Sequence, residues 1–71
     1  MSRFENPKDY QFLMLFTNGS LCARKNLKSK GFTDEFINRH LAKGWIIEMG
    51  TDDIGSPIYG ITKAGKDYRD Q

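Results

Sequence analysis

The chain has 71 residues, of which 38% are hydrophobic and 28% charged, and its formal net charge is +2. This length predicts a single domain over residues 1–71, with little room for a deep substrate pocket. One cysteine excludes an internal disulfide, and the N-terminus has no apolar run, so we expect a cytoplasmic rather than a secreted protein. The longest near-apolar stretch, residues 12–16, is too short to cross a bilayer, so we expect no membrane association.

The charges are distributed unevenly along the chain. Residues 1–47 carry eight Lys or Arg against four Asp or Glu, whereas residues 48–71 carry three against five. Basic residues are densest between positions 24 and 30, where no acid interrupts them: Arg24, Lys25, Lys28 and Lys30. Such a segment is either a solvated helix face or a surface for an anionic partner, and both interpretations stay open.

The N-terminal half predicts two helices. Asn6-Pro7 is typical of a helix start, and residues 18–20 (Asn-Gly-Ser) form a stop. The helix between them is apolar on nearly every side, which indicates burial on two sides. Residues 21–23 form a very short strand or an extended lead-in, and residues 24–30 form a short basic helix that Gly31 ends.

The C-terminal half predicts a helix, a hairpin and a last helix. Thr33 caps the helix, whose apolar stripe ends at Gly44, and residues 45–49 read as a strand. A turn-rich loop over residues 50–56 leads to a returning strand over residues 57–61. Thr62 caps a short helix over residues 63–69, in which we expect Gly65 to fill a tight packing position because glycine disfavours helices.

Two consecutive helices followed by a hairpin are typical of a helix-turn-helix with a wing. Residues 37–46 (Ile-Asn-Arg-His-Leu-Ala-Lys-Gly-Trp-Ile) resemble the end of a recognition helix that runs into a wing strand. Residues 59–68 are similar to the apolar–Thr–x–x–Gly–x–x–Tyr ending that follows the wing in MarR-like and PadR-like regulators. The resemblance lies mainly over residues 32–68. It implies an α+β winged helix-turn-helix, with a three-helix core, a β-hairpin wing and a short C-terminal helix.

This resemblance implies a small stand-alone protein that binds double-stranded DNA and regulates transcription. In helix-turn-helix proteins the first helix of the pair crosses the phosphate backbone and the second enters the major groove. We therefore expect the basic helix to contact phosphates, Asn38 and Arg39 to read base edges, and Lys43 to hold a further phosphate. The predicted DNA-binding residues are Arg24, Lys25, Lys28, Lys30, Asn38, Arg39 and Lys43.

The aromatic residues and the wing leave a second function open. The aromatic residues of the first helix exceed what so small a core needs, so they either form the core itself or contribute to a homodimer interface that includes Phe12, Leu15 and Phe16. Asp52 and Asp53 at the wing tip would repel phosphates. The alternative is therefore a winged-helix module for protein–protein interaction, which uses its acidic wing and its aromatic first helix.

Catalysis and metal binding have no support in the sequence. His40 and Cys22 are the only histidine and cysteine, whereas a structural zinc site needs four ligands. We expect His40 on the flank of the core and Cys22 as a small buried hydrophobe. No catalytic triad or phosphate loop is present, so we expect no enzymatic activity and no cofactor.

Overall fold

The computed structural model describes residues 4–71, which form an α+β fold with four α-helices and a three-stranded antiparallel sheet. In chain order these elements are α1 (Lys8–Met14), the 3₁₀ turn η1 (Thr17–Gly19), β1 (Cys22–Ala23), α2 (Arg24–Ser29), α3 (Asp34–Ala42), β2 (Ile46–Thr51), β3 (Pro57–Ile61) and α4 (Lys63–Arg69). The predicted order of elements is confirmed, and the returning strand and the last helix have the predicted bounds.

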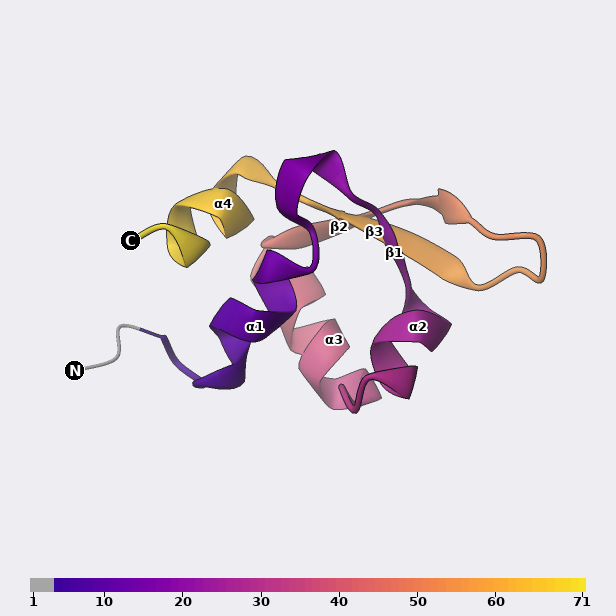
Figure 1. Ribbon diagram of the computed structural model, residues 1–71, viewed down its shortest axis with the longest axis horizontal. Helices are drawn as coiled ribbons and strands as arrows, with labels where there is room; N and C mark the ends of the chain where they lie inside the picture. Colours follow the sequence, from indigo (N-terminus) through magenta and orange to yellow (C-terminus); the bar gives the residue numbers. More distant parts are fainter. Residues whose placement is uncertain (1–3) are drawn as a thin grey trace.

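The sheet has the strand order β1-β3-β2, so the hairpin strand β3 lies between the other two. Cys22 of β1 is opposite Tyr59 of β3, and Ile46 of β2 is opposite Ile61. An irregularity between Glu48 and Gly50 interrupts the register of the hairpin. Figure 1 shows α1, α2 and α3 on one side of the sheet, α4 near one end, and the loop between β2 and β3 projecting at the other end.

One face of α1 and the turn that follows it supply much of the core. Phe12, Leu13 and Phe16 have no exposed surface, whereas Tyr10 and Met14 on the opposite face are 45% and 41% exposed. The prediction of burial on two sides was therefore wrong. The other buried apolar residues come from α2, α3 and the hairpin: Leu27, Ile37, Trp45, Ile46 and Tyr59.

The buried face of α1 also corrects the predicted homodimer interface. Phe12 and Phe16 are fully buried within the chain itself, and Leu15 is partly buried against the same core. Two side chains with no exposed surface cannot contact a second copy, so the prediction that Phe12 and Phe16 belong to an interface was wrong. The aromatic surplus is the core of a small domain, in which a few large side chains supply most of the buried area.

The predicted helix caps are present. The side-chain oxygen of Thr33 accepts a hydrogen bond from the backbone N–H of Phe36 at 3.1 Å, and that of Thr62 accepts one from Gly65 at 3.0 Å. The chain leaves α3 through Gly44, whose φ of +77° is a left-handed conformation that favours glycine. The next strand begins at Ile46 rather than at the predicted Trp45, which lies buried directly before it.

Gly65 occupies the tight position that its place in a helix predicts. A Cβ at this residue would overlap the backbone carbonyl oxygen of Trp45 and lie 2.8 Å from Cγ1 of Ile61. Because the first of these atoms belongs to the backbone, it cannot turn away as a flexible side chain would. Gly65 thus allows α4 to lie directly against the start of β2.

Candidate nucleic-acid interface

The predicted DNA-binding residues separate into two clusters, the first of which joins α2 to α3. Nε of Arg24 donates to Oδ1 of Asp34 at 2.9 Å, and Nζ of Lys28 donates to Oδ2 of the same carboxylate at 3.1 Å. Nη2 of Arg24 also donates to the amide oxygen of Asn38 at 3.0 Å. We call Arg24, Lys28, Asp34 and Asn38 the α2–α3 cluster. It brings together three of the seven predicted residues.

The charges of this cluster do not cancel, because two cations share one carboxylate. Hydrogen bonds from Lys28 and Arg24 lower the pKa of Asp34, so this acid stays ionised and its charge is compensated. Asn38 is exposed, and its amide oxygen retains a second lone pair beside the bond from Arg24. The arginine thus holds the amide in one orientation and leaves its N–H₂ group available to a ligand.

Lys25 and Lys30 extend the positive surface along α2. Both are exposed, and within residues 4–71 neither forms an ion pair with a carboxylate. The segment Arg24–Lys30 contains no acid. The backbone N–H of Lys25 donates to the hydroxyl of Ser56 at 3.3 Å, which ties the start of α2 to the hairpin loop.

The second cluster lies between α1, α3 and α4, and it contains Arg39. Nη1 and Nη2 of Arg39 donate to the two carboxylate oxygens of Asp9 at 2.9 and 2.8 Å, and Asp9 has no exposed surface. The guanidinium also lies over the rings of Phe36 and Trp45, 5.7 and 5.4 Å from their centroids. Arg39 is therefore engaged in an internal ion pair, although its side chain is 29% exposed, and its role as a reader of base edges stays a prediction.

Asp9 is held by further donors from distant parts of the chain. The Tyr68 hydroxyl of α4 donates to Oδ2 at 2.8 Å, and the backbone N–H of Asn6 donates to the same oxygen at 3.1 Å. Burial alone would raise the pKa of Asp9, but the hydrogen bonds from Arg39 and Tyr68 outweigh it and lower the pKa. A buried, ionised Asp9 therefore joins the N-terminal segment, α1, α3 and α4.

His40 lies beside this carboxylate and is also fully buried, rather than on the flank of the core. Its Nδ1 donates to the carbonyl oxygen of Phe36 at 2.8 Å, whereas Nε2 lies 3.1 Å from Oδ1 of Asp9 without the geometry of a hydrogen bond. Burial lowers the pKa of His40, and the Phe36 carbonyl and the Asp9 charge oppose this only in part. The pKa of His40 therefore lies below its usual value.

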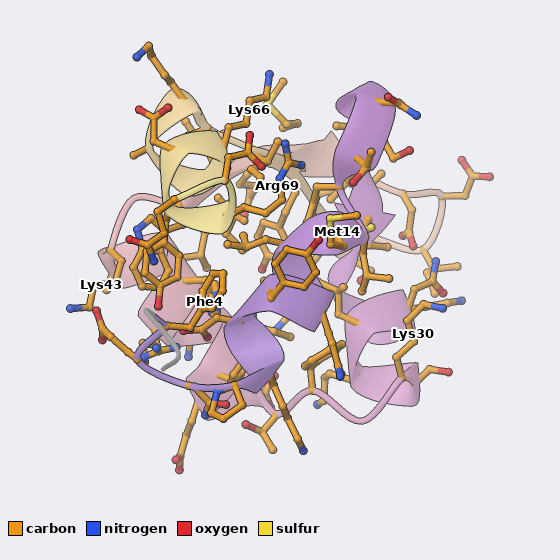
Figure 2. All side chains as sticks on the ribbon, turned by 60° about the vertical axis from the view of Figure 1, so that its left-hand side comes forward. Phe4, Met14, Lys30, Lys43, Lys66 and Arg69 are labelled. Carbon is orange, nitrogen blue, oxygen red and sulfur yellow. The ribbon has the colours of Figure 1, made fainter. Side chains whose placement is uncertain are left out.

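Lys43 belongs to the second cluster as well. Its Nζ lies 3.3 Å from a carboxylate oxygen of Glu5 and 5.9 Å from the centroid of the Trp45 ring. Figure 2 shows Lys43 and Lys30 on opposite sides of the molecule. Lys43 is therefore not part of one continuous basic surface with α2.

In the hairpin loop, the side chain of Asp52 stabilises the turn itself. Oδ1 of Asp52 accepts hydrogen bonds from the backbone N–H groups of Ile54 and Ser56 at 3.0 and 2.8 Å. Asp53 is exposed, and Ile54 beside it is 70% exposed. The tip therefore presents one acid and one large apolar side chain to solvent. Turn chemistry alone accounts for an aspartate at position 52.

Asp9 is the residue that our sequence analysis missed, although its position contained a signal. It precedes Phe12, Leu13 and Phe16 by three, four and seven residues, the spacing of one helix face. An acid on the buried face of a helix requires a partner, because an unpaired buried charge is costly. The partner could not be read from the sequence, since Arg39 lies 30 residues away.

Within residues 4–71, no three His, Cys, Asp or Glu side chains gather in a way that could hold a metal ion. None of the helices described above combines the length and the apolar character that a membrane span requires. Comparison of the chain with protein-family models, with curated proteins and with solved structures finds no match in any of the three. The resemblance to MarR-like and PadR-like regulators therefore stays a prediction.

Proposed function

We propose that the chain adopts a winged-helix fold and binds double-stranded DNA, as a small transcriptional regulator would. The arrangement of elements supports this proposal. α2 and α3 are consecutive helices joined by a short turn at Gly31, and the β2–β3 hairpin follows directly and pairs with β1. In this fold the first helix of the pair crosses the phosphate backbone and the hairpin is the wing.

The observation that carries the proposal is the basic surface of α2. Lys25, Lys28 and Lys30 are exposed on a helix without acids, and the one nearby carboxylate, Asp34, is compensated by Arg24 and Lys28. Phosphate neutralisation supplies most of the affinity of sequence-independent DNA binding. We infer that α2 lies along the phosphate backbone and that α3 presents Asn38 to the groove.

In this arrangement on DNA, we expect the wing to have a different role from α2. The charge of Asp53 is exposed, so contact of the loop with phosphates would be repulsive. We infer that the loop stays away from the backbone. Replacement of Asp52 and Asp53 by Asn tests this inference, because the amide oxygen of Asn can still accept the hydrogen bonds that close the turn. Unchanged affinity is expected, and tighter binding would show that the loop approaches phosphate.

Fluorescence anisotropy with a labelled random-sequence duplex, measured over a series of salt concentrations, tests the main proposal. The logarithm of the binding constant should fall linearly with the logarithm of the salt concentration. Lys30→Ala should reduce this slope by about one unit and weaken binding to all sequences alike. Lys63→Ala is the matched control, since Lys63 is 89% exposed on α4, which Figure 1 shows well apart from α2.

Two results would contradict DNA binding through α2. The first is the absence of salt-dependent affinity for any duplex at low ionic strength. The second is an equal loss of slope in the Lys63→Ala variant, because a diffuse charge effect does not require α2. In the first case a protein partner becomes the better hypothesis, with the loop tip in place of the first helix as its contact, since Ile54 and Asp53 are both exposed there.

A further inference from the structure

β2 is an open edge of the sheet. Within residues 4–71 it pairs with β3 alone, and its six residues make it much longer than β1 at the other edge, which has two. An edge strand offers unpaired backbone N–H and C=O groups, which are a template for another strand.

The register identifies which backbone groups face outward. The N–H of Thr62 donates to the carbonyl of Trp45 at 3.0 Å, so these two residues form a hydrogen-bonded pair. Because such pairs alternate along an antiparallel ladder, Ile47 bonds to Gly60, which is opposite it. The backbone groups of Ile46 and Glu48 therefore point away from the sheet.

The outer face beside this edge is apolar. Ile47 and Met49 of β2 are 52% and 60% exposed, and Leu21 next to β1 is 55% exposed. Leu21 and Met49 meet over Gly60, within 3.2 Å of the position that a Cβ would take there. β2 contains one charged residue, Glu48, and no lysine or proline of the kind that protects edge strands from pairing.

We propose that β2 pairs antiparallel with β2 of a second copy of this chain, about a two-fold axis at Ile47. The outward-facing backbone groups of one copy must bond to the outward-facing groups of the other. The two-fold axis can therefore pass only through Ile46, Ile47 or Glu48. An axis at Glu48 would set two like charges opposite each other. An axis at Ile46 would set Glu48 opposite Gly44, which lies before β2 in a left-handed conformation, so the outward backbone groups of Glu48 would have no strand to pair with.

The axis at Ile47 is self-complementary. Ile46 of each copy is then opposite Glu48 of the other, and each of these two pairs exchanges both backbone hydrogen bonds. The two Ile47 side chains meet in the closer, non-hydrogen-bonded position on the apolar face. The irregularity after Glu48 confines the pairing to this short segment. A second copy is the partner that satisfies every one of these groups reciprocally, and this inference holds with or without DNA binding.

Sedimentation equilibrium of the full chain over a wide range of concentrations tests the interface. The wild type should associate to a dimer, and Ile47→Lys should be a monomer with an unchanged circular dichroism spectrum, because the side chain is exposed. Ile54→Lys is the matched control: it adds the same charge at a side chain that is 70% exposed on the loop tip, and it should dimerise like the wild type. A wild type that stays monomeric, or an Ile47→Lys variant that still dimerises, would overturn the proposal.

Oxidative cross-linking tests the register. In a Cys22→Ser background, Ile47→Cys should form a covalent dimer under mild oxidation, since facing Cβ atoms of such a pair lie about 4.5–5.5 Å apart and a disulfide requires similar proximity. Thr51→Cys in the same background lies beyond the paired segment and should remain uncross-linked on a non-reducing gel. Cross-linking of Thr51→Cys as readily as Ile47→Cys would overturn the assigned axis.

Discussion

Replacement of Asp9 by Asn should destabilise the fold more than any other removal of a single charge that we consider. Asp9 is fully buried, binds both terminal nitrogens of Arg39, and accepts a hydrogen bond from Tyr68. An amide cannot accept at both of its ends, so one donor of Arg39 would face an N–H₂ group. The guanidinium would also lose its buried counter-charge and keep only the carboxylate of Glu5, 3.6 Å from Nη2.

The expected loss is large relative to the stability of a small domain. Removal of one partner from a buried ion pair costs about 3–5 kcal/mol. At about 0.05–0.15 kcal/mol per residue, a domain of 71 residues is stable by about 4–11 kcal/mol. The variant should therefore lose about half of its free energy of unfolding, and it unfolds outright if the wild type lies at the lower end of this range.

Urea denaturation followed by Trp45 fluorescence measures this loss. Trp45 is the sole tryptophan, is 8% exposed, and stacks on Tyr68 with 3.9 Å between ring centroids, so its emission reports on the packing of α4. Asp67→Asn is the control, because it also removes one negative charge but from an exposed pair with Lys63. It should leave the midpoint unchanged. An Asp9→Asn variant within about 1 kcal/mol of the wild type would refute the assigned role of the buried ion pair, given the cost expected for such pairs.

The other predictions concern Gly65 and His40. Gly65→Ala gains about 1 kcal/mol of helix propensity, but the cost of the overlap with the Trp45 carbonyl should exceed this gain. Urea denaturation should show a net loss of about 1–3 kcal/mol in the free energy of unfolding. A stabilised variant would contradict the packing of α4. Because burial lowers the pKa of His40 below its usual 6.5, the unfolded chain binds more protons than the folded chain at mildly acidic pH. The free energy of unfolding should therefore fall from about pH 7 to about pH 5, and this slope should be smaller in His40→Gln. Equal slopes in the two proteins would show that His40 is not the group responsible.

Local signals predicted much of the fold. Helix caps depend on a few neighbouring residues, so Thr33 and Thr62 could be assigned from the sequence, and the alternation of the returning strand gave its bounds. Gly65 could be assigned to a tight position because glycine inside a helix needs a packing reason. Each of these features depends on residues that are close together along the chain.

The candidate site was less predictable, because side-chain pairing depends on the tertiary fold. Asn38 and Arg39 are adjacent in α3, yet Arg24 holds the first toward solvent and Asp9 holds the second inside. Both are residue types that can contact bases, and no local sequence pattern shows which of the two side chains is exposed and which is paired inside the fold. The role of Phe16 was unpredictable for the same reason. The sequence pattern of an apolar residue is the same whether its side chain packs in its own core or against a second copy.

The internal pairing of Arg39 has a consequence for any DNA that the chain binds. With Arg39 held by Asp9, Asn38 is the one side chain among the predicted base readers that remains exposed on α3. A good bidentate base contact contributes about 1–3 kcal/mol of discrimination, whereas specific regulators exceed their own non-specific affinity by about 4–10 kcal/mol. A single copy would therefore bind largely through phosphates and discriminate little between sequences. Pairing through β2 would double the number of Asn38 contacts at a fixed spacing, so sequence preference should depend on the dimer more strongly than affinity does.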